Sequence, residues 1–398
     1  MGEKLLLAQS GGATAVINGS LVGAIEAAKR SGRFDEIVGS RNGIDGLLKQ
    51  SFIDLGRQSD ALLSLLRRTP SAALGTSRHK LNDDDAHRAL DVLRARQIHA
   101  FAYIGGNDSA DTAMRLGTLA RDAGYPLRVV SIPKTIDNDL HGTDHCPGYG
   151  SIARFLALAT RDAGLDTEAT RELYPIKLIE VMGRHAGWVG AATALGQQLP
   201  DEAPQLIFFP ERPPRDLDHL LGQIQQSYER VGHVVAIVPE TLRDVRGEPI
   251  AGDGVTWVDP FGHQYVPGPG PGLTRAIEST LGLRARFDKP GTIARMYVDS
   301  LSETDLAEAV LAGETAVELM LQGISGVMVT LERVSDEPYQ VRAGSIALEQ
   351  VANRERLLPD EFIGPDGRSV TDAFRRYALP LIDGSLPPIA RLAELPVR

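Results

Sequence analysis

Two short segments of the sequence combine glycine, lysine and carboxylates at a spacing that suits phosphate chemistry. The first is Gly105 to Ser109 (Gly-Gly-Asn-Asp-Ser), and the second is Pro133 to Asp139 (Pro-Lys-Thr-Ile-Asp-Asn-Asp). A glycine turn that leads into a helix directs backbone N–H groups and the positive end of the helix dipole at one place, which suits a phosphate. The second segment adds a lysine and two aspartates. Together the two segments predict phosphoryl transfer assisted by magnesium.

Both segments follow apolar runs that are typical of buried strands. Ala102 to Ile104 precede the first segment, and Leu127 to Ile132 precede the second. After the first glycine turn, apolar residues recur at a spacing that predicts one buried helix face: Ala113, Met114, Leu116 and Leu119. Adjacent parallel strands bring their carboxyl ends to one crevice, where open α/β sheets bind ligands. The sequence therefore predicts an α/β fold with both segments in one crevice.

Two loops add candidate phosphate ligands. Ser10 to Thr14 is a glycine turn between an apolar strand and a helix, a layout that is also common in α/β proteins that bind no phosphate. Leu74 to Arg78 (Leu-Gly-Thr-Ser-Arg) ends in an arginine, which can contact a phosphate through two hydrogen bonds. Taken alone, this arginine is equally typical of a solvated loop.

Two later strands also end in polar residues. The apolar run Ile176 to Val181 leads into Met182 to Gly187, which contains Arg184 and His185. The run His233 to Val238 leads to Glu240, a candidate for contact with a sugar hydroxyl. The breaker-rich stretch Val266 to Gly272 (Val-Pro-Gly-Pro-Gly-Pro-Gly) predicts a loop that no helix or strand contains.

The composition is that of an ordinary globular protein of 398 residues, with 42% hydrophobic and 24% charged residues. This length predicts two or three domains. The net charge of −10 disfavours a general binder of nucleic acid or anionic membranes. An anionic substrate would therefore need a local patch of cations. Arg284, Arg286 and Arg295 are candidates for that patch, although each is by default a surface residue.

A cytoplasmic location is the simplest expectation from this sequence. The single cysteine, Cys146, has no partner for an internal disulfide. The segment Met1 to Leu5 lacks the features of a signal peptide, and no apolar run approaches the roughly 20 residues that span a bilayer.

Four separated segments, in their order and spacing, resemble the phosphofructokinase family. They are Ser10 to Gly12, Gly105 to Ser109, Pro133 to Asp139, and Met182 to Arg184. The resemblance covers the chain from Lys4 to about Leu331. It implies two Rossmann-like three-layer domains with mostly parallel sheets and an active site in the cleft between them. The implied donor domain comprises residues 1–150 and about 290–345, and the implied sugar-phosphate domain comprises about 151–289 and 346–398.

Two departures from the pattern of the ATP-using members resemble the pyrophosphate-dependent branch. Asp108 and Lys134 each stand where the ATP-using members have a glycine. A carboxylate in place of a hydrogen fills space and repels the α-phosphate of a nucleotide in a crevice of low dielectric. A lysine ammonium can neutralise the compact, highly charged pyrophosphate.

The resemblance implies phosphoryl transfer from pyrophosphate to the 1-hydroxyl of fructose 6-phosphate, in either direction, with Mg²⁺ as cofactor. It makes Asp137 the general base, which must lie within hydrogen-bond reach of that hydroxyl. Asp139 would organise the base or the metal, and Lys134 would stabilise the transferring charge. The implied donor side also includes Gly12, Arg78, Gly106 and Asp108. The implied sugar side comprises Thr135, Met182, Gly183, Arg184, Glu240, Arg286 and Arg295.

Two further departures bear on the metal and on the sugar phosphate. Asn107 replaces an aspartate associated with the metal, and its carbonyl oxygen remains an acceptable Mg²⁺ ligand without the charge. Pro175 replaces an arginine that, in many members, reaches a neighbouring subunit's substrate. The 6-phosphate is then held by residues that the sequence does not identify. Because such contacts cross a subunit boundary in the family, we expect a homodimer or homotetramer.

Three alternatives stay open. The first is an ATP-dependent 6-phosphofructokinase that tolerates Asp108, and the second is a lipid or NAD kinase, which would lack the motif pair of Pro133 to Asp139 and Met182 to Arg184. The third is a catalytically dead sugar-phosphate sensor, which Asn107 and Pro175 suggest but which has no need of a general base. A different acceptor, such as sedoheptulose 7-phosphate, is also compatible with the motifs.

Overall fold

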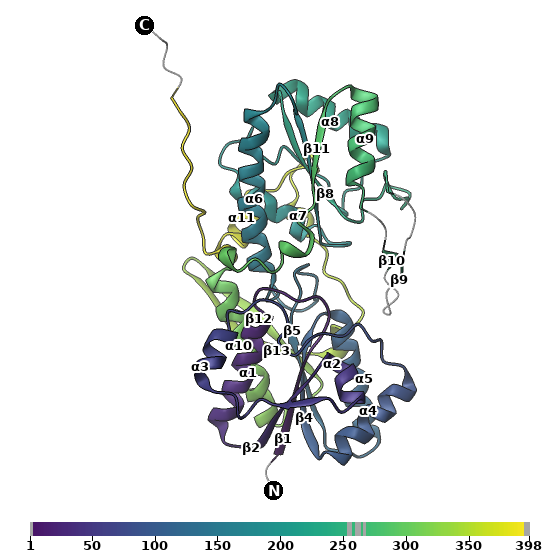
Figure 1. The fold of residues 1–398 in the computed structure, drawn as a ribbon, viewed down its shortest axis with the longest axis vertical. Coiled ribbons are helices and arrows are strands. Elements are labelled where there is room, and N and C mark those ends of the chain that lie inside the picture. The colour runs from purple at the N-terminus through teal and green to yellow at the C-terminus, as the bar shows by residue number, and fades with distance from the viewer. Residues whose placement is uncertain (1–2, 253–256, 259–263, 266–267, 394–398) are drawn as a thin grey trace.

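Two sheets with helices on both faces form the body of the molecule, one in each lobe of Figure 1. The computed structural model describes residues 3–252, 257–258, 264–265 and 268–393. Within these residues the larger sheet has seven strands in the order β13-β12-β5-β4-β1-β2-β3. Its five central strands run parallel, and β13 and β3 pair antiparallel at the two edges. The strands are β1 (Glu3–Gln9), β2 (Phe34–Ser40), β3 (Phe52–Asp54), β4 (Ile98–Gly105), β5 (Arg128–Pro133), β12 (Val327–Asp336) and β13 (Tyr339–Ala347).

Alternating side chains of the larger sheet build two separate cores, one on each face. In β1, Leu5 and Leu7 pack on one face, and Leu6 and Ala8 pack on the other, as the period of a strand requires. The first core includes residues of α1 (Ile17–Ser31), α3 (Asp60–Leu66) and α10 (Glu303–Leu321). The second includes residues of α2 (Gly43–Leu48), α4 (Asp83–Ala95) and α5 (Asn107–Asp122).

The smaller sheet is parallel and has the order β11-β6-β8-β7. Its strands are β6 (Ile176–Val181), β7 (Leu206–Ile207), β8 (Val234–Pro239) and β11 (Ala285–Asp288), and a separate antiparallel pair joins β9 (Trp257–Val258) to β10 (Gln264–Tyr265). The helices of this lobe are α6 (Tyr149–Ala169), α7 (Trp188–Ala192), α8 (Leu217–Val231), α9 (Gly270–Leu281) and α11 (Asp372–Ala378). Short 3₁₀ helices are η1 (Thr193–Gly196), η2 (Gly291–Ile293), η3 (Val298–Ser300), η4 (Leu348–Gln350), η5 (Asp360–Phe362) and η6 (Pro380–Ile382).

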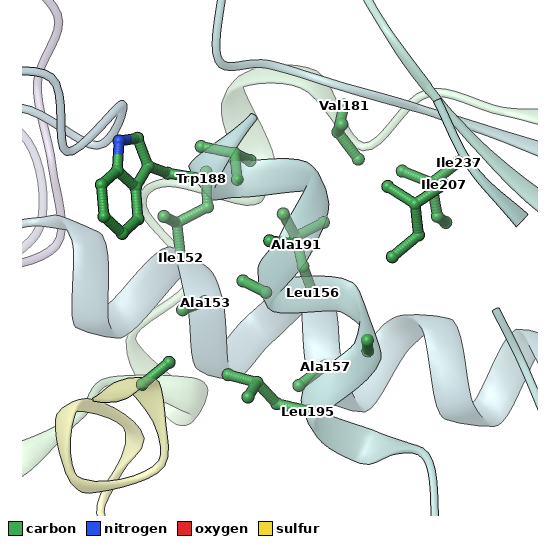
Figure 2. Packing of buried hydrophobic residues seen from close by; sticks show 14 of the residues in the cluster. Ile152, Ala153, Leu156, Ala157, Val181, Trp188, Ala191, Leu195, Ile207 and Ile237 are labelled. Atoms are coloured by element: carbon green, nitrogen blue, oxygen red, sulfur yellow. The ribbon is translucent and has the colours of Figure 1, made fainter. Parts of the chain in front are cut away.

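The smaller sheet also buries both faces. Figure 2 shows one of its cores, where Ile152 and Leu156 of α6 face Ala191 of α7, and Ile207 and Ile237 project from the strands beyond. Residues of α8 and α9 pack on the opposite face. Two three-layer units with mostly parallel sheets confirm the predicted α/β class.

The chain passes between the two lobes more than once. After β11 it returns to the larger sheet through α10, β12 and β13. It then crosses again, and Phe374 and Ala378 of α11 pack in the core of the smaller sheet together with residues of α6 and α7. Segments far apart in sequence therefore meet where the lobes join, and this junction holds the site described below.

The prediction of a loop from Val266 to Gly272 is wrong at the C-terminal end of that segment, because α9 begins at Gly270. Pro271 lies in the first turn of that helix, where a missing N–H leaves no hydrogen bond unmade. Residues 266–267 lie outside the described part of the chain. No helix among the described residues combines the length and apolar character needed to cross a membrane.

Candidate active site

A cleft of about 860 Å³ lies at the carboxyl ends of the strands of both sheets. It gathers predicted residues from loops that are far apart in sequence. The predicted residues that line it are Gly12, Arg78, Gly106, Asn107, Asp108, Lys134, Thr135, Asp137, Asp139, Met182, Arg184, Glu240 and Arg295. The cleft therefore brings together the predicted donor side and most of the predicted sugar side.

One end of the cleft is lined by the turn that follows β1. Lys134, at the end of β5, is 4% exposed, and its Nζ donates a hydrogen bond to the Gly12 carbonyl at 2.6 Å. A Cβ at Gly12 would overlap the guanidinium of Arg295, so Arg295 lies directly against this turn. Two cations and a glycine backbone thus share one place, which suits a compact anion.

The loop that carries Arg78 is anchored to the same turn. The backbone N–H of Gly11 donates to the Ser77 carbonyl at 3.2 Å. The Ser77 hydroxyl donates to Asp45 at 2.6 Å, and the ring of His79 lies between Asp45 (3.0 Å) and Asp85 (2.9 Å). These bonds hold the loop in place on both sides of Arg78, which lines the cleft.

Asn107 and Asp108 form the first turn of α5 and line the cleft beside Lys134. The side-chain oxygen of Asn107 is buried and has no hydrogen-bond partner. Mg²⁺ prefers oxygen ligands, keeps several waters and is commonly held by one or two protein groups together with substrate phosphates. Among the described residues, no three His, Cys, Asp or Glu side chains converge to hold a metal. The orphaned amide oxygen fits a Mg²⁺ that binds together with a phosphate.

Asp137 and Asp139 reach the cleft from one tight loop, in which Asn138 turns the other way. Asn138 has a φ of 55°, in the left-handed region, and is fully buried. Its amide group donates to the Tyr377 hydroxyl at 3.0 Å, and its oxygen accepts from the N–H of Cys146 at 3.0 Å. The two carboxylates flank an asparagine that the protein interior holds in place.

Burial controls the charges in the cleft. Burial, together with the neighbouring Asp139, raises the pKa of Asp137 to about 7, and burial also raises the pKa of Asp139. Burial and the positive charge of Arg295 lower the pKa of Lys134 to about 8. A carboxylate with a raised pKa is a competent base near neutral pH. A lysine with a pKa of about 8 is still mostly charged at neutral pH, and an anion that binds beside it raises that pKa and strengthens the charge.

The opposite side of the cleft is formed by the loops after β6 and β8. Arg184 lines the cleft with a φ of 50°, and Gly183 before it has a φ of 129°. A backbone in this region is costly for an arginine and is typical of functional loops. Burial raises the pKa of Glu240, whose N–H donates to the Val181 carbonyl at 2.9 Å. Met182 lines the cleft beside these groups.

Arg286 is a predicted site residue that does not line the cleft of its own chain. It lies on β11, 3.9 Å over the ring of Tyr174, with its Nη1 3.6 Å from Asp166. The prediction that it serves a substrate site stays a prediction. Any such role would need a neighbouring subunit.

Several groups that line the cleft were not predicted from the sequence. Arg243 and Lys289 add two cations, and Asn353 and Glu355 reach it from the segment after β13. Lys289 lies 2.5 Å from Glu180, which is 1% exposed. A glutamate inside the apolar strand Ile176–Val181 was the available signal, because a charge is rarely buried without a partner.

Known proteins share both the fold and the sequence motifs of this chain. Residues 4–320 match the sequence pattern of phosphofructokinase. A pyrophosphate–fructose 6-phosphate 1-phosphotransferase of Xanthomonas campestris is 41% identical over 96% of this chain and 92% of its own length. The chain belongs to the phosphofructokinase family. The four motif segments that carried the resemblance all lie inside the matched residues.

Two further proteins match nearly the full length of this chain. The crystal structure of a pyrophosphate-dependent phosphofructokinase from Nitrosospira multiformis superposes with a TM-score of 0.87, at 38% identity, over 98% of this chain and 94% of its own. A sulfofructose kinase of Alkalicoccus urumqiensis is 31% identical over 97% of both chains. The phosphofructokinase match ends at residue 320, so β12, β13 and the C-terminal segment lie beyond it.

Proposed function

We propose that this protein transfers a phosphoryl group from pyrophosphate to the 1-hydroxyl of fructose 6-phosphate. The products are fructose 1,6-bisphosphate and phosphate, and the reaction runs in both directions. The observation that carries the proposal is the pair Asp108 and Lys134 at the donor end of the cleft. A buried ammonium bound to the Gly12 carbonyl supports a compact, highly charged donor, and a carboxylate beside it disfavours the longer polyphosphate of a nucleotide.

We infer the following course for the reaction. Asp137 takes the proton from the 1-hydroxyl, and the oxygen forms a bond to the nearer phosphorus of pyrophosphate. The bond from that phosphorus to the bridging oxygen breaks, and phosphate leaves. Lys134 and Arg78 stabilise the charge on the transferring group, with Arg295 beside Gly12 as a third cation. Burial and the neighbouring Asp139 keep the pKa of Asp137 high enough for it to act as a base.

Mg²⁺ is the cofactor that we assign to this reaction. When bound, it would neutralise charge on the phosphoryl oxygens. The unpartnered oxygen of Asn107 supports this assignment, and Asp108 and Asp139 are carboxylates that line the same cleft. Gly106 would offer backbone contacts on the same side.

We assign donor binding to residues 1–150 with about 290–345, and sugar binding to about 151–289 with 346–398. On the sugar side we assign contacts to Thr135, Met182, Gly183, Arg184 and Glu240, of which all but Gly183 line the cleft. Arg295 was predicted for the sugar side, but we assign it to the donor because its guanidinium lies against the turn at Gly12. We further propose that Arg286 serves the site of a neighbouring subunit in a homodimer or homotetramer. We expect the enzyme to work in the cytoplasm.

A second acceptor is favoured by one observation. A relative with 31% identity over 97% of the chain is named a sulfofructose kinase. Pro175 stands where many members of the family have an arginine, so an acceptor of lower negative charge than a sugar phosphate is compatible with this site. A sulfofructose is therefore our second candidate acceptor.

The deciding experiment compares donors and acceptors in one assay with Mg²⁺. We expect fructose 1,6-bisphosphate from fructose 6-phosphate with pyrophosphate and not with ATP. Product from ATP alone would overturn the assignment of pyrophosphate as donor. Faster turnover of a sulfofructose than of fructose 6-phosphate would make the sulfofructose the assigned acceptor. Binding of fructose 6-phosphate without turnover by either donor would favour a sensor. In the variant Asp108→Gly we expect ATP to bind more tightly than in the wild type.

A further inference from the structure

A part of the chain beyond the family match holds the loop that carries Asp137 and Asp139. Arg356 makes the central contacts to this loop. It lies between η4 and η5 and after residue 320, where the match ends. Its Nε and Nη2 donate to the Asn138 carbonyl at 3.2 and 3.1 Å. Its Nη1 donates to the Thr143 carbonyl at 2.7 Å and also to the Asp144 carbonyl. One guanidinium therefore ties three backbone carbonyls of this loop together.

The backbone around Arg356 adds a second set of contacts to the same loop. The N–H of Arg356 donates to the Asp139 carbonyl at 2.7 Å, and Glu355 forms a β-bridge with Leu140. The guanidinium lies 4.3 Å over the ring of Trp188, whose Nε1 donates to the Arg356 carbonyl at 3.0 Å. Arg356 is thus fixed to the core of the smaller sheet and holds a loop of the larger one.

Tyr377 of α11 completes this arrangement. Its hydroxyl accepts from the side-chain amide of Asn138 at 3.0 Å and donates to the Asp144 carbonyl at 2.8 Å. Arg333 of β12 donates to the Asp144 carboxylate at 3.1 Å and to the Tyr377 carbonyl at 3.0 Å. Arg333, Arg356 and Tyr377, which make these contacts to the loop, all follow residue 320.

The position of Asn138 explains why such a support matters. Its φ of 55° lies in the left-handed region, which asparagine adopts more readily than most residues, and its side-chain contacts to Tyr377 and Cys146 fix it there. The carbonyl that Arg356 binds belongs to this same residue. If that backbone relaxed, the carboxylates on both sides of it would change direction, because both project from adjacent residues of the same turn.

We propose that Arg356 is a positioning residue for phosphoryl transfer, holding Asn138 so that Asp137 and Asp139 face the cleft, with Tyr377 in support. This inference rests on the proposed function, since it assigns Asp137 the role of base. Arginine suits the task because its planar fork offers five donors in a fixed geometry, whereas a lysine offers a single point charge. A displacement of about 1 Å at a reacting group can lower a rate by about 100-fold.

The test uses the full-length variants Arg356→Gln and Arg356→Lys with steady-state kinetics. We expect kcat of Arg356→Gln to fall by about 100-fold, while KM for both substrates changes by less than about threefold. Arg356→Lys should lie between the wild type and Arg356→Gln. The acid limb of the pH–rate profile should also shift, because the environment of Asp137 changes.

Arg375 provides a matched control. Its guanidinium also binds backbone carbonyls, those of Ala194 at 2.7 Å and Gln197 at 3.1 Å, but away from the cleft. Arg375→Gln should lower the melting temperature and leave kcat unchanged. A kcat in Arg356→Gln within threefold of the wild type would overturn the proposal. A loss of kcat in Arg375→Gln as large as that in Arg356→Gln would also overturn it.

A second pair of variants, with smaller changes, tests the proposal if Arg356→Gln does not fold. Tyr377→Phe removes only the hydroxyl that bonds to Asn138 and Asp144. Tyr125→Phe removes a hydroxyl that donates to the carbonyls of Leu93 and Ile98, far from the loop. We expect kcat to fall in Tyr377→Phe and not in Tyr125→Phe, and equal values in the two variants would overturn the proposal. An inactive wild type would instead refute the proposed function, so the two failures are distinguishable.

Discussion

The ammonium of Lys134 lies 2.6 Å from the Gly12 carbonyl, which joins the end of β5 to the turn after β1. This contact links two of the motifs on which the family resemblance depends. It also positions the cation at the donor end of the cleft before any ligand binds. Lys134 is buried and its pKa is lowered to about 8, so it remains mostly charged at neutral pH, and an anionic donor would stabilise the charge that burial disfavours.

Lys134→Met should abolish most use of pyrophosphate and leave the sugar site intact. The loss removes a cation that stabilises the transferring group, so we expect kcat/KM for pyrophosphate to fall by at least about 100-fold. Fructose 6-phosphate binding, measured by calorimetry, should change by less than about threefold. Lys177→Met is the matched control, because Lys177 is 7% exposed and pairs with Asp288 at 2.8 Å outside the cleft. Equal losses for both substrates would remove Lys134 from the donor role.

Asp137→Asn should remove the general base while preserving the shape of the side chain. We expect kcat to fall by about 10²- to 10⁴-fold, with little change in the affinity for fructose 6-phosphate. An assay of product formation measures kcat, and a direct binding experiment measures the affinity for fructose 6-phosphate. A variant that turns over at nearly the wild-type rate would show that another group takes the proton.

The same substitution should change stability in a pH-dependent way. The folded-state pKa of Asp137 is raised to about 7 from an ordinary value of 3.8, so the folded protein binds this proton more tightly than the unfolded chain does. The ionised carboxylate therefore destabilises the fold, fully above pH 7 and not at all below pH 3.8. We expect Asp137→Asn to raise the melting temperature more at about pH 8 than at about pH 5. An equal change at both pH values would contradict the raised pKa.

The pH–rate profile of the wild type should be bell-shaped. Asp137 must be ionised, so kcat/KM for pyrophosphate should fall as the pH drops below about 7. Lys134 must be charged, so the same quantity should fall as the pH rises above about 8. In Lys134→Arg the alkaline limb should disappear, because a guanidinium stays protonated. An unchanged alkaline limb in that variant would assign it to another group, such as pyrophosphate itself.

Gly12→Ala should impair the donor site without unfolding the protein. A Cβ at this position would overlap the guanidinium of Arg295, which must then move away from the turn. We expect KM for pyrophosphate to rise by about tenfold or more, which corresponds to about 1.4 kcal/mol. Gly117→Ala is the control, because it lies inside α5 and a Cβ there meets its nearest atom at 3.6 Å. That control should keep normal kinetics and gain about 0.4–1 kcal/mol of stability.

Local patterns are enough to predict the strands that end at the cleft and the turns that follow them. Glycines after apolar runs, and carboxylates and lysine at strand ends, indicate Gly12, Lys134, Asp137 and Glu240 from the order of residues alone. Such signals survive in the sequence because a strand end and its turn are neighbours along the chain. Parallel pairing then brings all such ends to one edge of a sheet, so their meeting in one cleft follows from the α/β class itself.

Only the tertiary structure decided which distant side chains complete and support the cleft. Arg243, Lys289 and Glu355 carry no local pattern that separates them from surface residues, and Arg356 lies more than 200 positions from the loop that it holds. The same limit applies to Arg286, whose motif position predicted a substrate contact although its side chain lies on Tyr174 outside the cleft of its own chain. Contacts of this kind depend on where the chain crosses between lobes. That path is fixed by the burial of whole helices and sheets, which no short stretch of sequence records.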